Sequence, residues 1–336
     1  MSTISYLEAI VVGGLQGITE LFPVSSLGHS VILPALIGGN WAKDLDVSTP
    51  ESPYLAFIVG LHVATAAALL LFFWRDWIRI IGGFVTSIRY RRISTDAERL
   101  AWLIVLATIP VGIAGLLLEH TFRTVLGRPM PAAAFLFANG LVLFLGEYLR
   151  RRAAPIGVGA SSVPVGASAA SVGGSAGAGV AGRDDSLMRS TDPDAGVDDR
   201  DADLRSDARL AGLTFKRGVL IGCAQILALL PGISRSGATM VAGLTQGLSH
   251  RDAARFSFLL ATPVILAAGA LKVPDLFGPL GAGIHGQILA GSIASFVCAY
   301  VAVKFLERYF RTRTLVPFAV YCLVAGAVSF VVLAAR

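Results

Sequence analysis

Residues 15–30 read LQGITELFPVSSLGHS and combine an apolar pattern with several polar side chains. The apolar stretch before Pro23 and the one that follows at residues 30–38 are each too short to cross a bilayer, which takes about 20 residues. Two short apolar stretches joined by a Pro- and Ser-rich turn are typical of a re-entrant hairpin, which enters and leaves the membrane on one side. We therefore predict a re-entrant helical hairpin over about residues 3–38.

The second half of the chain contains a matching stretch, AQILALLPGISRSGA. Pro231 and Ser234 have the same spacing there as Pro23 and Ser26 in the first stretch. An apolar segment precedes the turn and another follows it, again without the length of a full span. We predict a second re-entrant hairpin over about residues 214–248.

The composition is typical of a membrane protein. Of 336 residues 54% are hydrophobic and only 15% are charged, whereas soluble domains carry roughly 25% charged residues. Six further apolar segments approach the span length: 55–74, 101–118, 132–149, 256–276, 286–303 and 316–334. The sequence predicts an all-α polytopic membrane protein in which each half is a re-entrant hairpin plus three transmembrane helices. The start of the chain lacks a basic region followed by a cleavage site, so we expect no removable signal peptide.

The positive charge predicts the orientation of the chain rather than a nucleic-acid partner. Although the net charge is +6, the arginines gather at the ends of apolar segments, in the basic loop at residues 75–99 and at residues 150–152 and 307–314. Such clusters favour the cytoplasmic side of a membrane. The first hairpin then opens to the outside and the second to the cytoplasm. Two halves of similar pattern and opposite orientation form an inverted repeat, whose broken helices build a site near the midplane.

Residues 153–210 separate the two halves. The segment is first rich in Gly, Ala and Ser and then acidic. This composition cannot bury enough apolar surface to offset its ordering entropy. We predict a disordered cytoplasmic linker, a tether rather than a binding tail, between a first membrane repeat at residues 1–152 and a second at residues 211–336.

The first turn carries candidate catalytic groups. Gln16 and Glu20 lie one helical turn apart on the same face, and an ionisable group at membrane depth is costly and is usually functional. A structural ion pair with an arginine is the alternative for Glu20. Ser25, Ser26 and His29 follow at the turn, where unpaired backbone amides can bind an anion.

The two histidines of the first half are predicted to differ. His29 lies about a turn from Glu20 and the serines, which makes it a candidate base. His62 lies inside an apolar span and is more simply explained as a structural side chain.

The second turn supplies a cation. Arg235 lies between Ser234 and Ser236, and Gly232 and Gly237 flank this group. A guanidinium group matches phosphate oxygens with its planar fork, and hydroxyls and amides at the turn can complete the site. The two turns together predict a site for a phosphorylated, membrane-borne substrate.

These two stretches closely resemble the signature regions of the bacterial undecaprenyl-diphosphatase family, known for bacitracin resistance. The first, QGITELFPVSSLGHS, is similar to its E/Q-x-x-x-E and PVSS-x-GH patterns, and the second, PGISRSGAT, to its PG-x-SRSGAT pattern. FSFLLATP at 256–263 and VPFAVY at 316–321 add to the resemblance, which covers both membrane halves and leaves out residues 153–210. It implies a multi-pass inverted-repeat protein of the plasma membrane, commonly a homodimer, whose site opens to the external or periplasmic side.

The resemblance also implies an activity and roles for residues. Family members hydrolyse undecaprenyl diphosphate to undecaprenyl phosphate and inorganic phosphate, which recycles the carrier for cell-wall polymers. The implied catalytic residues are Glu20, Ser26, His29 and Arg235, and the implied substrate-binding residues are Gln16, Ser25, Ser234, Ser236 and Gly237. A divalent cation, Mg²⁺ or Ca²⁺, would be held partly by Glu20. Two positions depart from the pattern: Leu27 replaces a frequent Thr, and Gln16 leaves less negative charge for a cation.

The mechanism and one rival function stay open at this point. We favour attack of Ser26 on the terminal phosphorus with His29 or Glu20 as base, and direct attack by water is the alternative. The rival function is a polyprenyl-phosphate transporter or flippase, because inverted repeats with broken helices are common in transporters. A transporter needs only binding groups, whereas these turns offer a nucleophile, a base and a phosphate clamp together.

Overall fold

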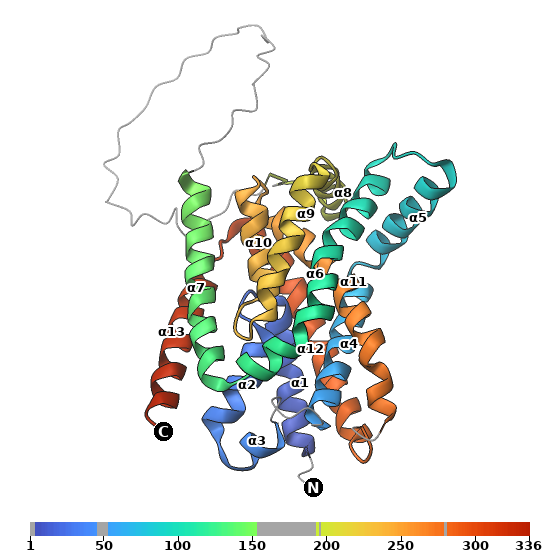
Figure 1. Ribbon diagram of the computed structural model, residues 1–336. Helices are drawn as coiled ribbons and strands as arrows, with labels where there is room; N and C mark the ends of the chain where they lie inside the picture. The colour runs from blue at the N-terminus through green and yellow to red at the C-terminus, as the bar shows by residue number, and fades with distance from the viewer. Residues whose placement is uncertain (1–3, 46–52, 153–192, 195, 279–280) are drawn as a thin grey trace, which may run out of the picture.

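The computed structural model describes residues 4–45, 53–152, 193–194, 196–278 and 281–336. These residues form helices, turns and short connections, with no regular strand among them. Within them, five helices are long and apolar enough to cross a membrane, and up to seven spans result if each of two bent helix pairs counts as one. The helices pack as an upright bundle (Figure 1). The chain is therefore an all-helical, multi-pass membrane protein.

The first hairpin consists of α1 (Tyr6–Leu21) and α2 (Ser26–Ile37), followed by the short α3 (Gly39–Asp44). The break at the turn is local in origin. Ser25 adopts a left-handed φ of 69° and its side chain accepts a hydrogen bond from the amide of Gly28, which caps α2.

Five of the six predicted apolar segments lie inside one helix each, and the sixth, 55–74, extends past the end of its helix at Phe72. The six helices are α4 (Pro53–Phe72), α6 (Asp96–Leu126), α7 (Pro129–Arg152), α11 (His250–Phe277), α12 (His285–Thr312) and α13 (Val316–Ala334). The predicted loop at residues 75–99 is in large part a helix, α5 (Trp74–Tyr90), bent by 86° from α4. The prediction of a loop was wrong because the arginines hid an amphipathic helical pattern.

The second hairpin is less regular than the first. It consists of α9 (Phe215–Cys223), the 3₁₀ helix η2 (Ala224–Leu229) and, after the turn, α10 (Arg235–Thr245). The first hairpin begins at the end of the bundle where the C-terminus also lies, whereas α9 and α10 begin and end toward the opposite end (Figure 1). Both turns reach the interior of the bundle.

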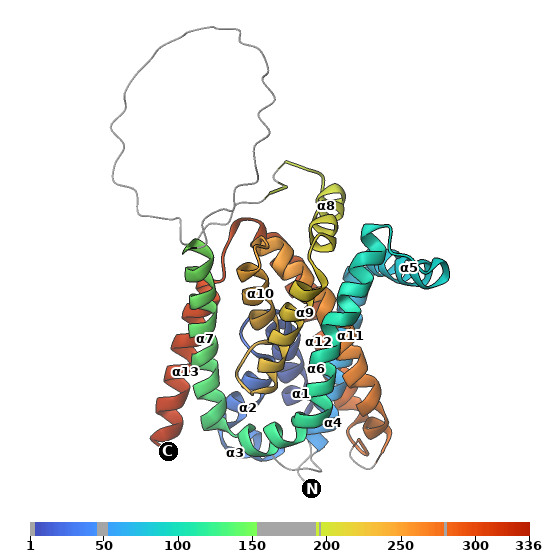
Figure 2. The same cartoon turned by 45° about the horizontal axis from the view of Figure 1, so that its top comes forward.

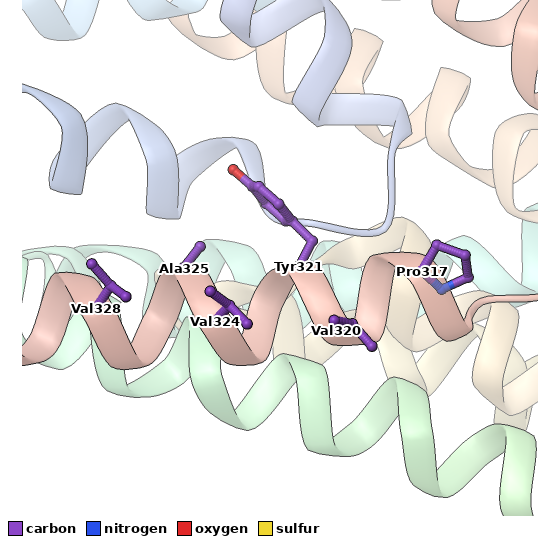
Figure 3. A pocket seen from close by; sticks show the side chains of 6 residues that line it. All are labelled: Pro317, Val320, Tyr321, Val324, Ala325 and Val328. Carbon is purple, nitrogen blue, oxygen red and sulfur yellow. The ribbon is translucent and has the colours of Figure 1, made fainter.

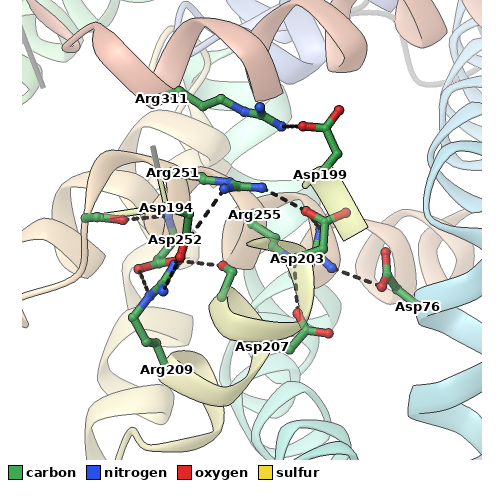
Figure 4. A network of polar contacts seen from close by, with 12 residues as sticks. Asp76, Asp194, Asp199, Asp203, Asp207, Arg209, Arg251, Asp252, Arg255 and Arg311 are labelled. Atoms are coloured by element: carbon green, nitrogen blue, oxygen red, sulfur yellow. Dashed lines mark hydrogen bonds and ion pairs between the residues drawn. The ribbon is translucent and has the colours of Figure 1, made fainter. Parts of the chain in front are cut away.

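Part of the predicted disordered linker is a helix, α8 (Asp199–Ala211). Residues 153–192 lie outside the described part of the chain, but for residues 199–210 the prediction was wrong. Two of the α8 aspartates, Asp203 and Asp207, face arginines of α11, so that charge pairing replaces the apolar burial that the composition lacks (Figure 4).

Two fully buried arginines form the centre of this contact. The side chains of Arg251 and Arg255 are each 1% exposed. Arg255 Nε donates to Asp207 of α8 at 2.9 Å, and Arg251 Nη2 donates to Asp203 at 3.0 Å. Removing one partner of a buried ion pair leaves an uncompensated charge and is strongly destabilising. We therefore expect the α8–α11 ion pairs to stabilise this end of the bundle.

A third arginine extends the ion network. Arg209 bridges Asp194 (2.7 Å) and Asp252 (2.8 Å), joining α8 and the residues before it to the start of α11. The hydrogen bonds from the Arg209 guanidinium hold the pKa of Asp194 below its ordinary value.

Close packing of α1 against α12 fixes the position of the first turn along the axis of the bundle. A Cβ atom on Gly13 would lie 2.2 Å from the carbonyl oxygen of Gly291, and one on Gly17 would lie 2.2 Å from that of Ser295. Only glycine allows this approach, which is a common way for membrane helices to associate. The tips of the two hairpins also touch, since a Cβ on Gly28 would lie 2.9 Å from the Cα of Gly232.

Candidate active site

The carboxylate of Glu20, in the last turn of α1, is the centre of a polar cluster inside the bundle. Gln16 Nε2 donates to Glu20 Oε2 at 3.0 Å, and the hydroxyl of Ser26 donates to the same oxygen. Arg235 Nη2, 215 positions away in the chain, donates to Glu20 Oε1 at 3.1 Å. The cluster is only slightly exposed, with Glu20 and Ser26 at 8% each. The two turns thus bring a carboxylate, a hydroxyl and a guanidinium together.

Two atoms of this cluster are buried and have no hydrogen-bond partner within the protein: Arg235 Nη1, a donor, and Gln16 Oε1, an acceptor. Exchanging the amide atoms of Gln16 would not help, because its oxygen would then face the Glu20 carboxylate. Buried polar atoms are nearly always satisfied, and exceptions are frequent at functional sites. The free donor of Arg235 is suited to an anionic oxygen of a ligand, and the free acceptor of Gln16 is suited to a hydroxyl group, a water molecule or a cation bound beside it.

The serines of the second turn hold the two hairpins together. Ser234 caps α10 by accepting from the amide of Gly237 at 3.1 Å. Ser236 Oγ donates to the carbonyl oxygen of Phe22, in the first turn, at 3.0 Å. Ser25 acts in the same local way on α2. In the structure these hydroxyls are occupied with positioning the turns.

Asn139 of α7 joins the turns as well and was missed by sequence reasoning. Its side chain donates to the carbonyl oxygen of Pro23 and accepts from the amide of Ser234, both at 3.0 Å. It is fully buried. An isolated asparagine in an apolar span was the available signal, since such a residue needs polar partners.

His29 does not contact the Glu20 cluster among the described contacts. Its Nδ1 lies 2.6 Å from the carbonyl oxygen of Ser25, and its Nε2 lies 2.7 Å from the hydroxyl of Tyr321 on α13. Tyr321 also lines an open apolar groove along α13 (Figure 3). The other lining residues are Pro317, Val320, Val324, Ala325 and Val328. The site therefore lies beside an apolar surface, with the His29–Tyr321 pair at its edge.

His62 of α4 occupies the place by the carboxylate that His29 was expected to take. Its Nε2 lies 3.5 Å from Glu20 Oε2 and 3.1 Å from Gln16 Nε2. Its Nδ1 lies 2.9 Å from the carbonyl oxygen of Ile58, which assigns a proton to Nδ1 and leaves Nε2 to accept or donate toward the cluster. The expectation of a merely structural histidine does not describe this position. No local sequence pattern indicated it, because α4 and α1 are brought together only by the fold.

The cluster offers few ligands for a metal ion. Among the described residues no group of three or more His, Cys, Asp or Glu side chains is suitably placed. The available oxygens are the Glu20 carboxylate and the unpartnered Gln16 Oε1. Mg²⁺ is commonly bound by one or two carboxylates together with water and substrate phosphate. The residues therefore fit such a shared ion and do not fit one held by the protein alone.

Comparison with known proteins agrees with the family resemblance of the two sequence motifs. The family model described as bacitracin resistance protein BacA matches residues 9–178 and 188–328. A protein of Mycolicibacterium paratuberculosis named undecaprenyl-diphosphatase is 64% identical over 333 residues, 99% of each chain. Undecaprenyl-diphosphatase 1 of Frankia casuarinae is 54% identical over 366 residues, covering 98% of this chain and 99% of its own. Undecaprenyl-diphosphatase 2 of Chromobacterium violaceum is 37% identical over 327 residues, covering 96% and 97%.

These matches correct one expectation. The resemblance was expected to leave out residues 153–210, but the family match includes all of this segment except residues 179–187. It therefore includes α8 and its ion network.

Proposed function

Since the chain belongs to the bacitracin resistance protein BacA family, we propose that it is an undecaprenyl-diphosphatase, which releases inorganic phosphate from undecaprenyl diphosphate and leaves undecaprenyl phosphate. This reaction recycles the lipid carrier for cell-wall polymer synthesis and accounts for bacitracin resistance. The observation that carries the proposal is the cluster in which Ser26, Glu20 and Arg235 meet from two separate turns. A nucleophile, a proton acceptor and a phosphate-binding cation are the groups that phosphoanhydride hydrolysis requires.

The diphosphate binds where the two turns meet. Arg235 Nη1, unpartnered within the protein, donates to an oxygen of the terminal phosphate. Both α2 and α10 begin at this place, with Ser26 and Arg235 as their first residues, and the positive ends of helix dipoles favour an anion. The polyprenyl tail lies along the apolar groove of α13.

In the reaction, Ser26 Oγ attacks the terminal phosphorus and its proton passes to Glu20, whose oxygen already accepts that hydrogen bond. The anhydride bond breaks and undecaprenyl phosphate leaves. Water then cleaves the phosphoserine and releases inorganic phosphate. Arg235 stabilises the charge on the phosphoryl oxygens throughout. Of the two expected bases, Glu20 is supported by geometry, and His62 with Gln16 orients its carboxylate.

A divalent cation is also part of the proposal. Glu20 and Gln16 Oε1 would hold Mg²⁺ or Ca²⁺ together with substrate oxygens, and the ion would supply Lewis-acid neutralisation of phosphate charge. Because Glu20 and Gln16 supply too few ligands to hold the ion alone, it would bind together with the substrate.

The topology completes the proposal. The halves form an inverted repeat in the plasma membrane, supported by the matching order of hairpin and three helices and by the opposite ends from which the hairpins begin. The basic residues of α5 and of the end of α7 favour a cytoplasmic location for their end of the bundle, which supports entry of the first hairpin and of the lipid head from the external side. A homodimer is the assembly that the family implies.

The decisive experiment is phosphate release from undecaprenyl diphosphate by the purified full chain in detergent with Mg²⁺. Wild type is expected to release phosphate, and Ser26→Ala, which removes only the hydroxyl, is expected to be inactive while folding normally. Trapping of a phosphoserine by acid quench supports attack by Ser26, and its absence with retained activity of wild type supports attack by water. A wild-type chain that binds the phosphorylated lipid but releases no inorganic phosphate would favour the transporter.

A further inference from the structure

The helix α5 carries an apolar stripe that no part of the described chain covers. Trp74, Ile78, Ile81, Val85 and Ile88 are each between 50% and 64% exposed. Their spacing alternates between four and three residues, which places all of them on one side of a helix.

The opposite side of α5 is fastened to the bundle. Asp76, Ile80, Gly83 and Ser87 are buried on that side, and Ser87 accepts a hydrogen bond from Trp102 of α6 at 2.9 Å. The stripe thus points away from the protein, and it does so in a helix that leaves α4 at 86° and extends outward from the bundle (Figure 2).

Basic and aromatic side chains border the stripe. Four exposed arginines belong to α5 or follow it directly: Arg75, Arg89, Arg91 and Arg92. At the two ends the guanidinium groups lie over rings, Arg75 over Trp74 at 5.1 Å and Arg89 over Tyr90 at 6.0 Å. Trp and Tyr favour the membrane–water interface, and arginine extends its charge from apolar surface toward headgroups.

We propose that α5 lies in the plane of the membrane surface, with its stripe in the acyl boundary of one leaflet and its arginines on anionic lipid headgroups. An amphipathic helix with an apolar face bordered by Lys or Arg is the form that binds such a surface. The direct connection to a spanning helix keeps α5 at bilayer level. A second copy of the chain is the weaker occupant, because two copies of the stripe would bring their arginine borders together.

This contact has a structural consequence. Asp76 of α5 pairs with Arg255 of α11 at 3.0 Å, and Arg79 pairs with Asp207 of α8. The helix that lies on the lipid surface is therefore bonded to the two helices of the buried ion network.

Site-directed spin labelling of the full chain in lipid nanodiscs tests the proposal. Ile81→Cys places a label in the stripe, and Thr86→Cys, exposed on the flank of the same helix, is the matched control. Cys223→Ala and Cys298→Ala remove the partly accessible native thiols, and buried Cys322 remains. With phosphatidylglycerol present, the label at position 81 is expected to collide several-fold more with oxygen than with a water-soluble nickel chelate, and the label at position 86 to show the reverse preference.

A second variant tests the charge. In this variant Arg75, Arg89, Arg91 and Arg92 are all replaced by Gln. In nanodiscs that contain phosphatidylglycerol, its label at position 81 is expected to show a lower preference for oxygen, equal to that of the unsubstituted protein in phosphatidylcholine alone. Equal preferences of the unsubstituted protein in the two lipids overturn the role of anionic headgroups. Nickel access at position 81 in both lipids, or dipolar broadening between labels of two copies, overturns the membrane contact in favour of water or of a second copy. Phosphate release by each labelled protein shows that it is folded.

Discussion

Glu20 is the residue at which the side chains of the candidate site meet. It accepts hydrogen bonds from Gln16 and Ser26 through one oxygen and from Arg235 through the other, and His62 lies beside it. A carboxylate with this set of partners at membrane depth explains the spacing of Gln16 and Glu20 in the sequence.

Glu20→Gln keeps the size of the side chain and removes its charge. Phosphate release is expected to fall by about 10²-fold or more, in line with the loss of a general base. The assay is phosphate release from undecaprenyl diphosphate at saturating lipid, with thermal unfolding as a control for folding. Turnover close to that of wild type in a well-folded variant would exclude Glu20 as the proton acceptor.

His62 is a positioning residue, so the identity of its replacement matters. His62→Leu removes the hydrogen-bonding group next to Gln16 and Glu20 and is expected to lower kcat by about 10-fold or more, the cost of about 1.4 kcal/mol for a buried polar group left unpaired. His62→Gln can still donate and accept there and is expected to restore most of the rate. The pH profile of kcat separates the roles, since the Gln variant loses any limb that histidine titration supplies. Equal rates for Leu and Gln would contradict hydrogen bonding as the reason for this residue.

At the scale of single elements, α8 shows how charge pairing can fix a helix of polar composition. Two of its aspartates, Asp203 and Asp207, pair with Arg251 and Arg255, which are fully buried on α11. The helix is held by partners that are far away in the sequence.

Asp207→Ala is expected to lower the melting temperature of the purified protein by several degrees. The change removes one partner of buried Arg255, which retains Asp76 and Asp203, so the cost is below the about 3–5 kcal/mol of a fully orphaned buried charge. Asp201→Ala, on the exposed side of the same helix, is the matched control and is expected to have little effect. If the two variants melt at the same temperature, the α8–α11 ion pairs do not stabilise the bundle.

Sequence patterns predicted the elements well where one physical signal dominates. Long apolar segments correspond to α4, α6, α7 and α11–α13, because a spanning helix must be apolar over its length. They failed for α5, whose arginines hid an amphipathic pattern, and for α8, which is polar and is held by partners from elsewhere in the chain. At the candidate site they predicted Glu20, Ser26 and Arg235, which the fold brings together, but His62 and Asn139 come from other helices and had no motif to mark them.

At the scale of the whole molecule, the structure links the site to the sidedness of the membrane. Both described ends of the chain lie at one end of the bundle, and α5 and α8 lie at the other (Figure 1). The first hairpin begins at the former end, so the side to which it opens decides from which leaflet the lipid head arrives.

Cysteine labelling in intact cells tests this sidedness. Asn40→Cys, exposed on α3 at the open end of the first hairpin, is expected to react with a membrane-impermeant maleimide, because the charge distribution predicts that this end faces outside. Thr95→Cys, exposed between α5 and α6, is expected to react only after the membrane is permeabilised. The parent chain, whose three native cysteines lie within helices of the bundle, serves as the background control. Labelling of position 95 in intact cells with protection of position 40 would reverse the topology, and the same cluster of Glu20, Ser26 and Arg235 would then take its lipid from the cytoplasmic leaflet.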